Sequence, residues 1–146
     1  MSFWSAVIPI APMATPRPKF HSVINGDSRS VVTYYDRKYT NYQNEVHQYL
    51  EDHALLNEDF FETMKSPMGV LAEIVFYVKV AKDQKQITSL MRTTAPDIDN
   101  LSKGIIDSIF MGLKIRDSRI VGLNAIKMNE KDYPRTEVRF VGINDE

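Results

Sequence analysis

The sequence predicts an α+β domain, a small mixed sheet with two main helices packed on it. Two segments carry apolar residues at three- and four-residue steps, which is typical of amphipathic helices. The segments around them are rich in β-branched residues and are bounded by turn residues, which indicates strands. The chain has 146 residues, of which 43% are apolar, and this suffices for one domain with a buried core. We therefore expect residues 1–146 to form a single domain with the element order β-β-α-β-α-β-β.

The first third of the chain predicts strands followed by a helix. Residues 2–20 start with mixed apolar residues and then carry four prolines, so we expect a short strand that leads into an extended loop. Residues 24–35, INGDSRSVVTYY, combine a turn cluster with a β-rich run, which favours a hairpin. A helix is predicted from Arg37 to about Leu56, and its apolar face consists of Tyr39, Tyr42, Val46, Tyr49 and Leu50. Tyrosines at this spacing indicate core packing or a dimer face rather than a surface on which bases stack.

The rest of the chain predicts a strand, a second helix and two closing strands. Residues 57–67 indicate a polar or weakly helical connection, and residues 67–80 have the length and β-branched content of a central strand. A polar loop or frayed hairpin is expected over residues 81–96. The remaining elements are a helix from Asp97 to about Phe110 and strands over residues 118–130 and 135–143.

Composition excludes several classes of protein. The chain has no cysteine, so a disulfide framework and a thiolate zinc site are excluded, and oxygen or histidine ligands would have to hold any metal. The net charge of −1 argues against a protein that coats polyanions by bulk electrostatics. The apolar run over residues 3–13 has no basic residue ahead of it and is broken by prolines. It predicts neither a signal peptide nor a membrane span, and we expect a cytoplasmic protein.

The predicted second helix opens with a concentration of acid in the stretch TTAPDIDNLSKGIIDSI, residues 93–109. Asp97 can cap the helix, and carboxylates in a first turn complement the helix dipole. Asp99, Lys103 and Asp107 recur at four-residue steps and therefore share a face. Because Asp97 can fill the capping role alone, Asp99 and Lys103 remain to be explained. Two carboxylates that converge at a helix start favour a bound cation.

Ordinary structural roles are the alternative for each of these residues. Capping explains most isolated Asp-x-Asp pairs, and a Lys103–Asp107 pair would be surface support. Asp117, taken alone, would be a turn residue that makes a local side-chain bond. However, it lies in the link between the helix and the next strand, where a loop can fold back toward the end of the sheet. Mg²⁺ takes a few carboxylates, water and substrate phosphate, so three aspartates with a lysine fit this ion.

The stretches PDIDNLSKGIIDSI, IRDSRIVGL and IKM together resemble the RusA-type Holliday junction resolvases, small endonucleases of phage and prophage origin. The segments PRPKF and YYDRKYTNYQNEVHQYL are similar to the amino-terminal half of that family, so most of the chain is covered. Residues 57–67 and 81–92 match least well. The Asp-x-Asp-Asn-Leu-x-Lys core with a downstream aspartate is much more specific than any of its parts.

The resemblance implies that Asp97, Asp99 and Asp117 bind Mg²⁺, with Mn²⁺ as a substitute, and that Lys103 completes the catalytic set. It also implies a homodimer with two active sites that nick opposed strands of a four-way DNA junction in recombination and repair. The products would carry 5′-phosphate ends, and the enzyme would act in the cytoplasm of a bacterium or a phage-infected cell. Many relatives have acid where this chain has Arg116 and a basic residue where it has Ala95, which bears on local charge and phosphate affinity.

Basic residues near these motifs are candidates for DNA contacts, since lysine and arginine contacts to phosphate supply most sequence-independent affinity. The candidates are Arg17, Lys19, Arg116, Arg119 and Lys127. A metal held by the three aspartates would lower the pKa of a bound water, while Lys103 would stabilise the transition state or orient that water.

Three other functions stay open at this point. A nuclease on the same fold could prefer flaps or forks, since shape selection depends on how a dimer spaces its two sites. A non-catalytic module could bind branched DNA, with the acidic residues serving as caps and turns only. A small interaction protein could bind a basic partner through the acidic residues 46–62, but this would leave the Asp-Lys pattern unexplained.

Overall fold

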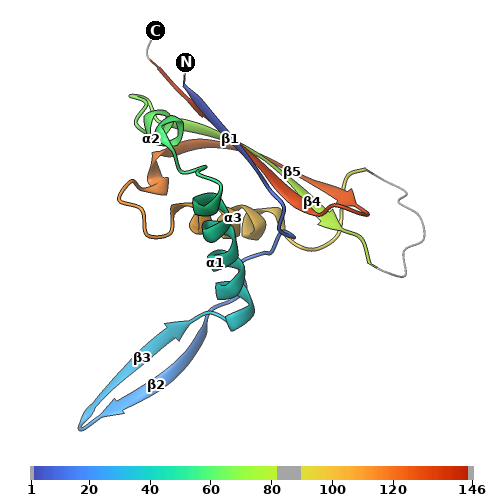
Figure 1. Ribbon diagram of the computed structural model, residues 1–146. Helices are drawn as coiled ribbons and strands as arrows, with labels where there is room; N and C mark the ends of the chain where they lie inside the picture. Colours follow the sequence, from blue (N-terminus) through green and yellow to red (C-terminus); the bar gives the residue numbers. More distant parts are fainter. Residues whose placement is uncertain (1, 82–89, 145–146) are drawn as a thin grey trace.

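A four-stranded sheet in the order β1-β6-β4-β5 forms the centre of the fold in the computed structural model, which describes residues 2–81 and 90–144 (Figure 1). The strands are β1 Phe3–Ile8, β4 Val70–Lys79, β5 Ile120–Glu130 and β6 Arg135–Gly142. β4 pairs in parallel with β5, whereas the β1–β6 and β4–β6 pairs are antiparallel. A parallel pair needs a crossover connection, and helix α3, Ile98–Phe110, lies in that connection.

The helices cover one face of this sheet (Figure 1). Alternate residues of β1 and β4 are buried, as expected for strands with one face against a core. Helices α1, Arg37–Asp52, and α2, Glu58–Met64, pack there together with α3. The ring of Phe60 on α2 lies 5.0 Å from that of Trp4 and 5.6 Å from that of Phe110, which joins α2 to β1 and α3.

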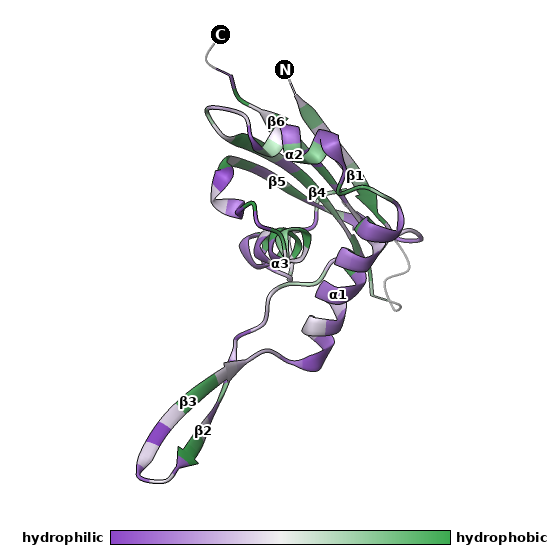
Figure 2. Cartoon of the chain, turned by 60° about the vertical axis from the view of Figure 1, so that its left-hand side comes forward, coloured by the Kyte–Doolittle hydropathy of each residue, from purple (hydrophilic) through white to green (hydrophobic). Residues whose placement is uncertain are grey.

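A two-stranded hairpin, β2 Lys19–Asn25 and β3 Ser28–Tyr34, projects away from the sheet and the helices (Figure 1). Gly26 turns the chain at its tip with φ of 65°, a conformation that glycine adopts without strain. Hydrophobic residues are visible along both strands (Figure 2). Phe20, Ile24 and Val31 share one face in the strand register and are each at least 63% exposed.

A strap of residues 9–18 joins β1 to the hairpin and crosses α3 (Figure 2). The backbone N–H of Thr15 donates to the carbonyl of Asn100 at 3.0 Å, and its hydroxyl bonds the phenol of Tyr39 at 2.9 Å. The approach is close because position 104 is glycine: a Cβ there would lie 2.6 Å from the carbonyl oxygen of Met13. The strap therefore fixes the root of the hairpin beside the middle of α3.

The predicted α+β class is confirmed, with differences in the elements. Three strands precede the first helix, as the predicted strand and hairpin require, whereas the predicted element order counted only two. The weakly helical connection is the helix α2, capped by the Asn57 side chain, which accepts from the Phe60 N–H at 3.1 Å. The first helix ends at Asp52, earlier than predicted, because Ala54 has a positive φ of 52°.

Two of the three tyrosines on the predicted stripe of α1 are in the core, which is one of the two roles that the spacing indicated, and Tyr49 is partly buried beside them. Tyr39 and Tyr42 are 1% and 4% exposed, so neither ring offers a surface for base stacking. The loop or frayed hairpin expected over residues 81–96 is seen only in part, because residues 82–89 lie outside the described residues. Met91 forms an isolated antiparallel bridge with Met128 on β5. None of the described helices is long and apolar enough to span a membrane.

Candidate active site

Helix α3 presents a charged stripe to the outside because its opposite face is buried. Leu101, Ile105 and Ile109 are fully buried in the core. This packing fixes the rotation of the helix, and Asp99 and Lys103 are exposed on the other side. Because the apolar stripe is buried, Asp99 and Lys103 share an exposed face, as predicted.

Asp97 is the N-cap residue of α3, but its side chain makes no capping hydrogen bond. The expectation that Asp97 alone satisfies the cap is therefore wrong, although its position is right. Its backbone is extended, with φ of −72° and ψ of 139°, and among residues 2–81 and 90–144 its carboxylate has no hydrogen bond or ion pair. Asp99 Oδ1 accepts from the N–H of Asn100 at 3.0 Å. The carboxylate of Asp97 is thus left available for a ligand.

Lys127 fixes the chain that leads into α3. It lies opposite the buried Phe76 in the β4–β5 register, so it points to the face that the helices cover. Its ammonium donates to the carbonyl oxygens of Thr94 at 2.9 Å and Pro96 at 2.8 Å. The side chain of Lys127 therefore ties β5 to the residues that immediately precede Asp97.

Asp117 begins the short 3₁₀ helix η1, Asp117–Arg119, between α3 and β5. The guanidinium of Arg119 anchors this turn: it donates to the carbonyl of Met64 at 3.1 Å and to that of Ser66. The carboxylate of Asp117 is exposed and has no hydrogen bond or ion pair in the described part of the chain. The Arg119 side chain thus anchors the turn, while the carboxylate of Asp117 remains accessible to solvent.

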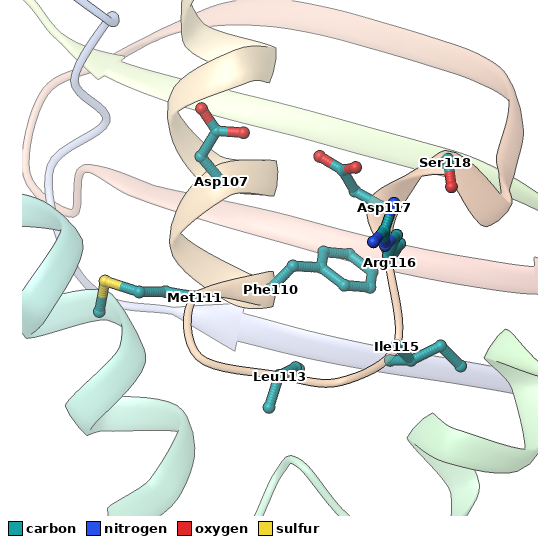
Figure 3. A pocket seen from close by; sticks show the side chains of 8 residues that line it. All are labelled: Asp107, Phe110, Met111, Leu113, Ile115, Arg116, Asp117 and Ser118. Carbon is teal, nitrogen blue, oxygen red and sulfur yellow. The ribbon is translucent and has the colours of Figure 1, made fainter.

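The carboxylates of Asp107 and Asp117 point toward the same space between α3 and η1 (Figure 3). Two surface hollows meet there, and both carboxylates line each of them. Arg116 lines the first hollow, and Lys103 lines the second, whose volume is about 470 Å³. Six water molecules fill roughly 180 Å³ at ~30 Å³ each. The second hollow therefore has room for a hydrated cation together with a phosphate group.

Lys103 and Asp107 form an ion pair across one helical turn, with Nζ 3.1 Å from Oδ2. The hydrogen bond and charge of Asp107 raise the pKa of Lys103 above its ordinary value. The lysine is consequently an ammonium at neutral pH. The pairing that the sequence offered as ordinary surface support exists, but it lies at the edge of the hollow that Asp117 also lines.

The structure brings together only part of the predicted acidic set. Lys103 and Asp117 share a hollow, whereas Asp97 and Asp99 lie at the start of α3. Among the described residues, no three histidine, cysteine, aspartate or glutamate side chains converge as a metal site. The predicted donors are nevertheless all exposed carboxylates, and Mg²⁺ commonly uses one or two of these and fills its shell with water and phosphate. The donor chemistry therefore fits this ion.

The five basic candidates for DNA contacts divide into two groups. Arg17 and Arg116 are exposed, and Lys19 is paired with Asp36 at 3.6 Å on an open surface. Arg119 and Lys127 already donate to backbone carbonyls, as described above. These two contacts give both side chains a structural role that the sequence did not indicate.

Asp107 is the residue of this site that the sequence did not single out. Its spacing from Lys103 was visible, but its position opposite Asp117 depends on how η1 folds back along α3 (Figure 3). The four-residue step was the available signal, and it did not distinguish a site residue from surface support.

A comparison with family models identifies the chain. The endodeoxyribonuclease RusA model matches residues 9–140, which include every acidic and basic residue of the site. The chain belongs to the RusA family. No curated protein matches it. Membership in the RusA family implies an endonuclease that resolves Holliday junctions and acts on branched DNA.

Proposed function

We propose that this RusA-family protein is a Mg²⁺-dependent homodimer that resolves four-way DNA junctions by paired symmetric nicks. The observation that carries the proposal is the hollow between α3 and η1, where Lys103 lies beside the carboxylates of Asp107 and Asp117 (Figure 3). A cation and carboxylates at one open surface suit phosphodiester hydrolysis, which needs stabilisation of developing negative charge and activation of water.

The chain would divide this chemistry among a few residues. Asp97, Asp99 and Asp117 would hold the metal, which supplies Lewis acidity and a bound water of lowered pKa when present. The Lys103 ammonium would sit against a non-bridging oxygen of the scissile phosphate and balance its charge in the transition state. Attack of water on the phosphorus with departure of the 3′ oxygen would leave 5′-phosphate and 3′-hydroxyl ends.

Two residues outside this set would support the geometry. Lys127 holds the carbonyl of Pro96 and so fixes the backbone just before Asp97. Arg119 holds η1 against the end of α2 and so fixes Asp117. Both hold elements that carry metal ligands, and such supporting contacts commonly matter as much as the ligands themselves.

Homodimerism follows from the proposed reaction. A four-way junction is close to two-fold symmetric, and two opposed nicks need two copies of the site in a fixed relation. Closed two-fold dimers supply such a relation with one self-complementary interface. Arg17, Lys19 and Arg116 are the basic residues that we assign to the phosphate backbone in each copy.

Cleavage of a labelled synthetic four-way junction tests the proposal, with linear duplex, flap and fork DNA as competing substrates and with Mg²⁺ or a chelator. Asp99→Asn is the test variant. Asp52→Asn is the matched control, since Asp52 is likewise an exposed helix carboxylate that accepts one hydrogen bond, from Gln48 at 2.7 Å. We expect paired, metal-dependent nicks on the junction that Asp99→Asn loses and the control keeps. Preference for flaps or forks would reassign the substrate, and binding without cleavage would leave a DNA-binding module.

A further inference from the structure

The β2–β3 hairpin carries an apolar face that the described part of the chain leaves uncovered. Phe20, Ile24 and Val31 share this face in the strand register and are 63%, 66% and 66% exposed. The hairpin projects clear of the sheet and the helices in both views (Figure 1, Figure 2). A two-stranded hairpin alone is at best marginally stable in water, and exposed apolar patches mark interaction sites. We therefore expect a ligand to cover this face.

The hairpin segment has the opposite charge to the rest of the chain. Residues 17–38 contain five lysines and arginines and two aspartates, which gives a net charge of +3. The other residues together carry −4, because the whole chain has −1. Only one of the five cations, Lys19, has an ion pair within the described residues, with Asp36. All five are exposed: Arg17, Lys19, Arg29, Arg37 and Lys38. The segment is therefore complementary to a polyanion.

The root of the hairpin is fixed beside the candidate active site. Thr15, in the strap before β2, bonds the carbonyl of Asn100 on α3 at 3.0 Å and the phenol of Tyr39 on α1 at 2.9 Å. The ring of Tyr35, directly after β3, lies 5.2 Å from that of Tyr39. Both strands thus leave the body next to the helix that carries Lys103. Strands of seven residues reach about 24 Å, or roughly seven base-pair steps of DNA.

An apolar face flanked by cations suits branched DNA better than a continuous duplex. In a duplex the bases stack on each other, so a protein meets phosphates and the edges of the bases. At the centre of an opened four-way junction, base pairs lose a stacking neighbour and expose their faces. Aromatic side chains stack on such bases, and aliphatic side chains insert at disrupted base steps.

We propose that the apolar face of the β2–β3 hairpin packs on unstacked bases at the branch point of junction DNA, with Phe20 as the stacking residue. This inference rests on the proposed function, in which a four-way junction is the substrate. Ile24 and Val31 continue the apolar contact, and Arg29 lies opposite Ile24 in the register, on the same face, where it can meet a phosphate. The hairpin of a second copy has the same positive charge and would be repelled.

Binding to an immobile four-way junction and to a linear duplex tests this, with Ca²⁺ in place of Mg²⁺ to suppress cleavage. Phe20→Ala should weaken junction binding about fivefold to 100-fold, and duplex binding about twofold or less, because phosphate contacts supply the latter. Phe20→Trp keeps a stacking ring and should bind the junction like the wild type. Val32→Ala is the matched control, since Val32 is an exposed valine on the opposite face of the hairpin.

Ile24→Ala repeats the test at a second position of the same face. We expect it to weaken junction binding by a smaller factor than Phe20→Ala, again with little effect on the duplex. The comparison at Ile24 decides the matter if Phe20→Ala disorders the hairpin. Thermal unfolding of all variants should match the wild type, because these side chains lie outside the core.

Three outcomes would overturn the inference. One is an equal loss of affinity for junction and duplex, and another is unchanged junction affinity in both Phe20→Ala and Ile24→Ala. The third is a dimer of the DNA-free wild type that dissociates in Phe20→Ala during sedimentation, which would assign the face to the acidic body of a partner subunit. Junction cleavage by the wild type is scored separately. Cleavage with full junction affinity in both alanine variants refutes this inference alone, whereas a wild type that neither binds nor cleaves the junction refutes the proposed function as well.

Discussion

Gly104 controls how closely the strap of residues 9–18 packs on α3. Its replacement by alanine tests whether the free energy of unfolding falls or rises. A Cβ at this position would lie 2.6 Å from the Met13 carbonyl oxygen, closer than the 3.0 Å that real Cβ contacts respect. The opposing atom belongs to the backbone and cannot rotate aside. The strap must therefore move off the helix in Gly104→Ala.

The free energy of unfolding should fall even though alanine is the better helix former. Helix propensity alone would stabilise Gly104→Ala by about 1 kcal/mol. Overpacking costs roughly 1–3 kcal/mol. The shift also weakens the Thr15 bonds to Asn100 and Tyr39, which are 3.0 and 2.9 Å long, and each such bond contributes about 1 kcal/mol. The net change is a destabilisation of about 1–3 kcal/mol, or roughly 3–10 °C in Tm.

Urea unfolding followed by tryptophan fluorescence measures this change. Trp4 is the single tryptophan and is 3% exposed, so its emission reports loss of the core. Asn41→Ala at an exposed position of α1 is the control, because it raises helix propensity on the solvent side of that helix. If Gly104→Ala were as stable as the control or more stable than the wild type, the close packing of the strap on α3 would be refuted.

Three further substitutions test the site and the residues that support it. Lys127→Met removes the ammonium that donates to the carbonyl oxygens of Thr94 and Pro96. We expect junction cleavage to be about tenfold slower with little change in Tm. A loss confined to DNA affinity would instead make Lys127 a phosphate contact. Asp117→Asn should slow cleavage at least about 100-fold in gel assays while junction binding persists; retained cleavage would remove Asp117 from the metal set. Burial raises the pKa of the Tyr42 phenol because the neutral form is favoured in the core. The neutral phenol therefore contributes its full stabilisation below the unfolded pKa of about 10, and this contribution to the free energy of unfolding is lost as the pH rises above that value. Tyr42→Phe should therefore unfold with a shallower dependence on alkaline pH, and an identical dependence would contradict this assignment.

Local signals predicted the elements that carry the acids. The spacing of Asp99, Lys103 and Asp107 defines a helix face wherever a helix forms, and the buried leucine and isoleucine stripe fixes its direction. The Asn-Gly turn likewise predicts a hairpin from residues adjacent in sequence. These features depend on neighbours within one or two turns of the chain, so the sequence alone suffices.

Contacts between residues far apart in the chain determine the roles that the sequence left open. Arg119 looks like any exposed cation near a DNA site, but its carbonyl partners at Met64 and Ser66 lie more than fifty residues away in the chain. The opposition of Asp107 and Asp117 depends in the same way on the path of η1 (Figure 3). No local pattern encodes the direction in which a loop folds back, so residue type and spacing left these roles undetermined.

The distribution of charge along α3 gives the proposed cation a second role, in the acceptance of DNA. Asp97, Asp99 and Asp107 span about 15 Å along α3, roughly two screening lengths of physiological salt, and Asp117 lies in the turn that follows. The ammonium groups of Lys103 and Lys127 are already engaged, one by Asp107 and the other by backbone carbonyls. A phosphate that approaches meets more carboxylate than free cation and is repelled. The proposed divalent ion would reverse that balance locally, so we expect metal binding and substrate binding to be coupled. A DNA-binding module without a metal would have no reason to keep these acids here.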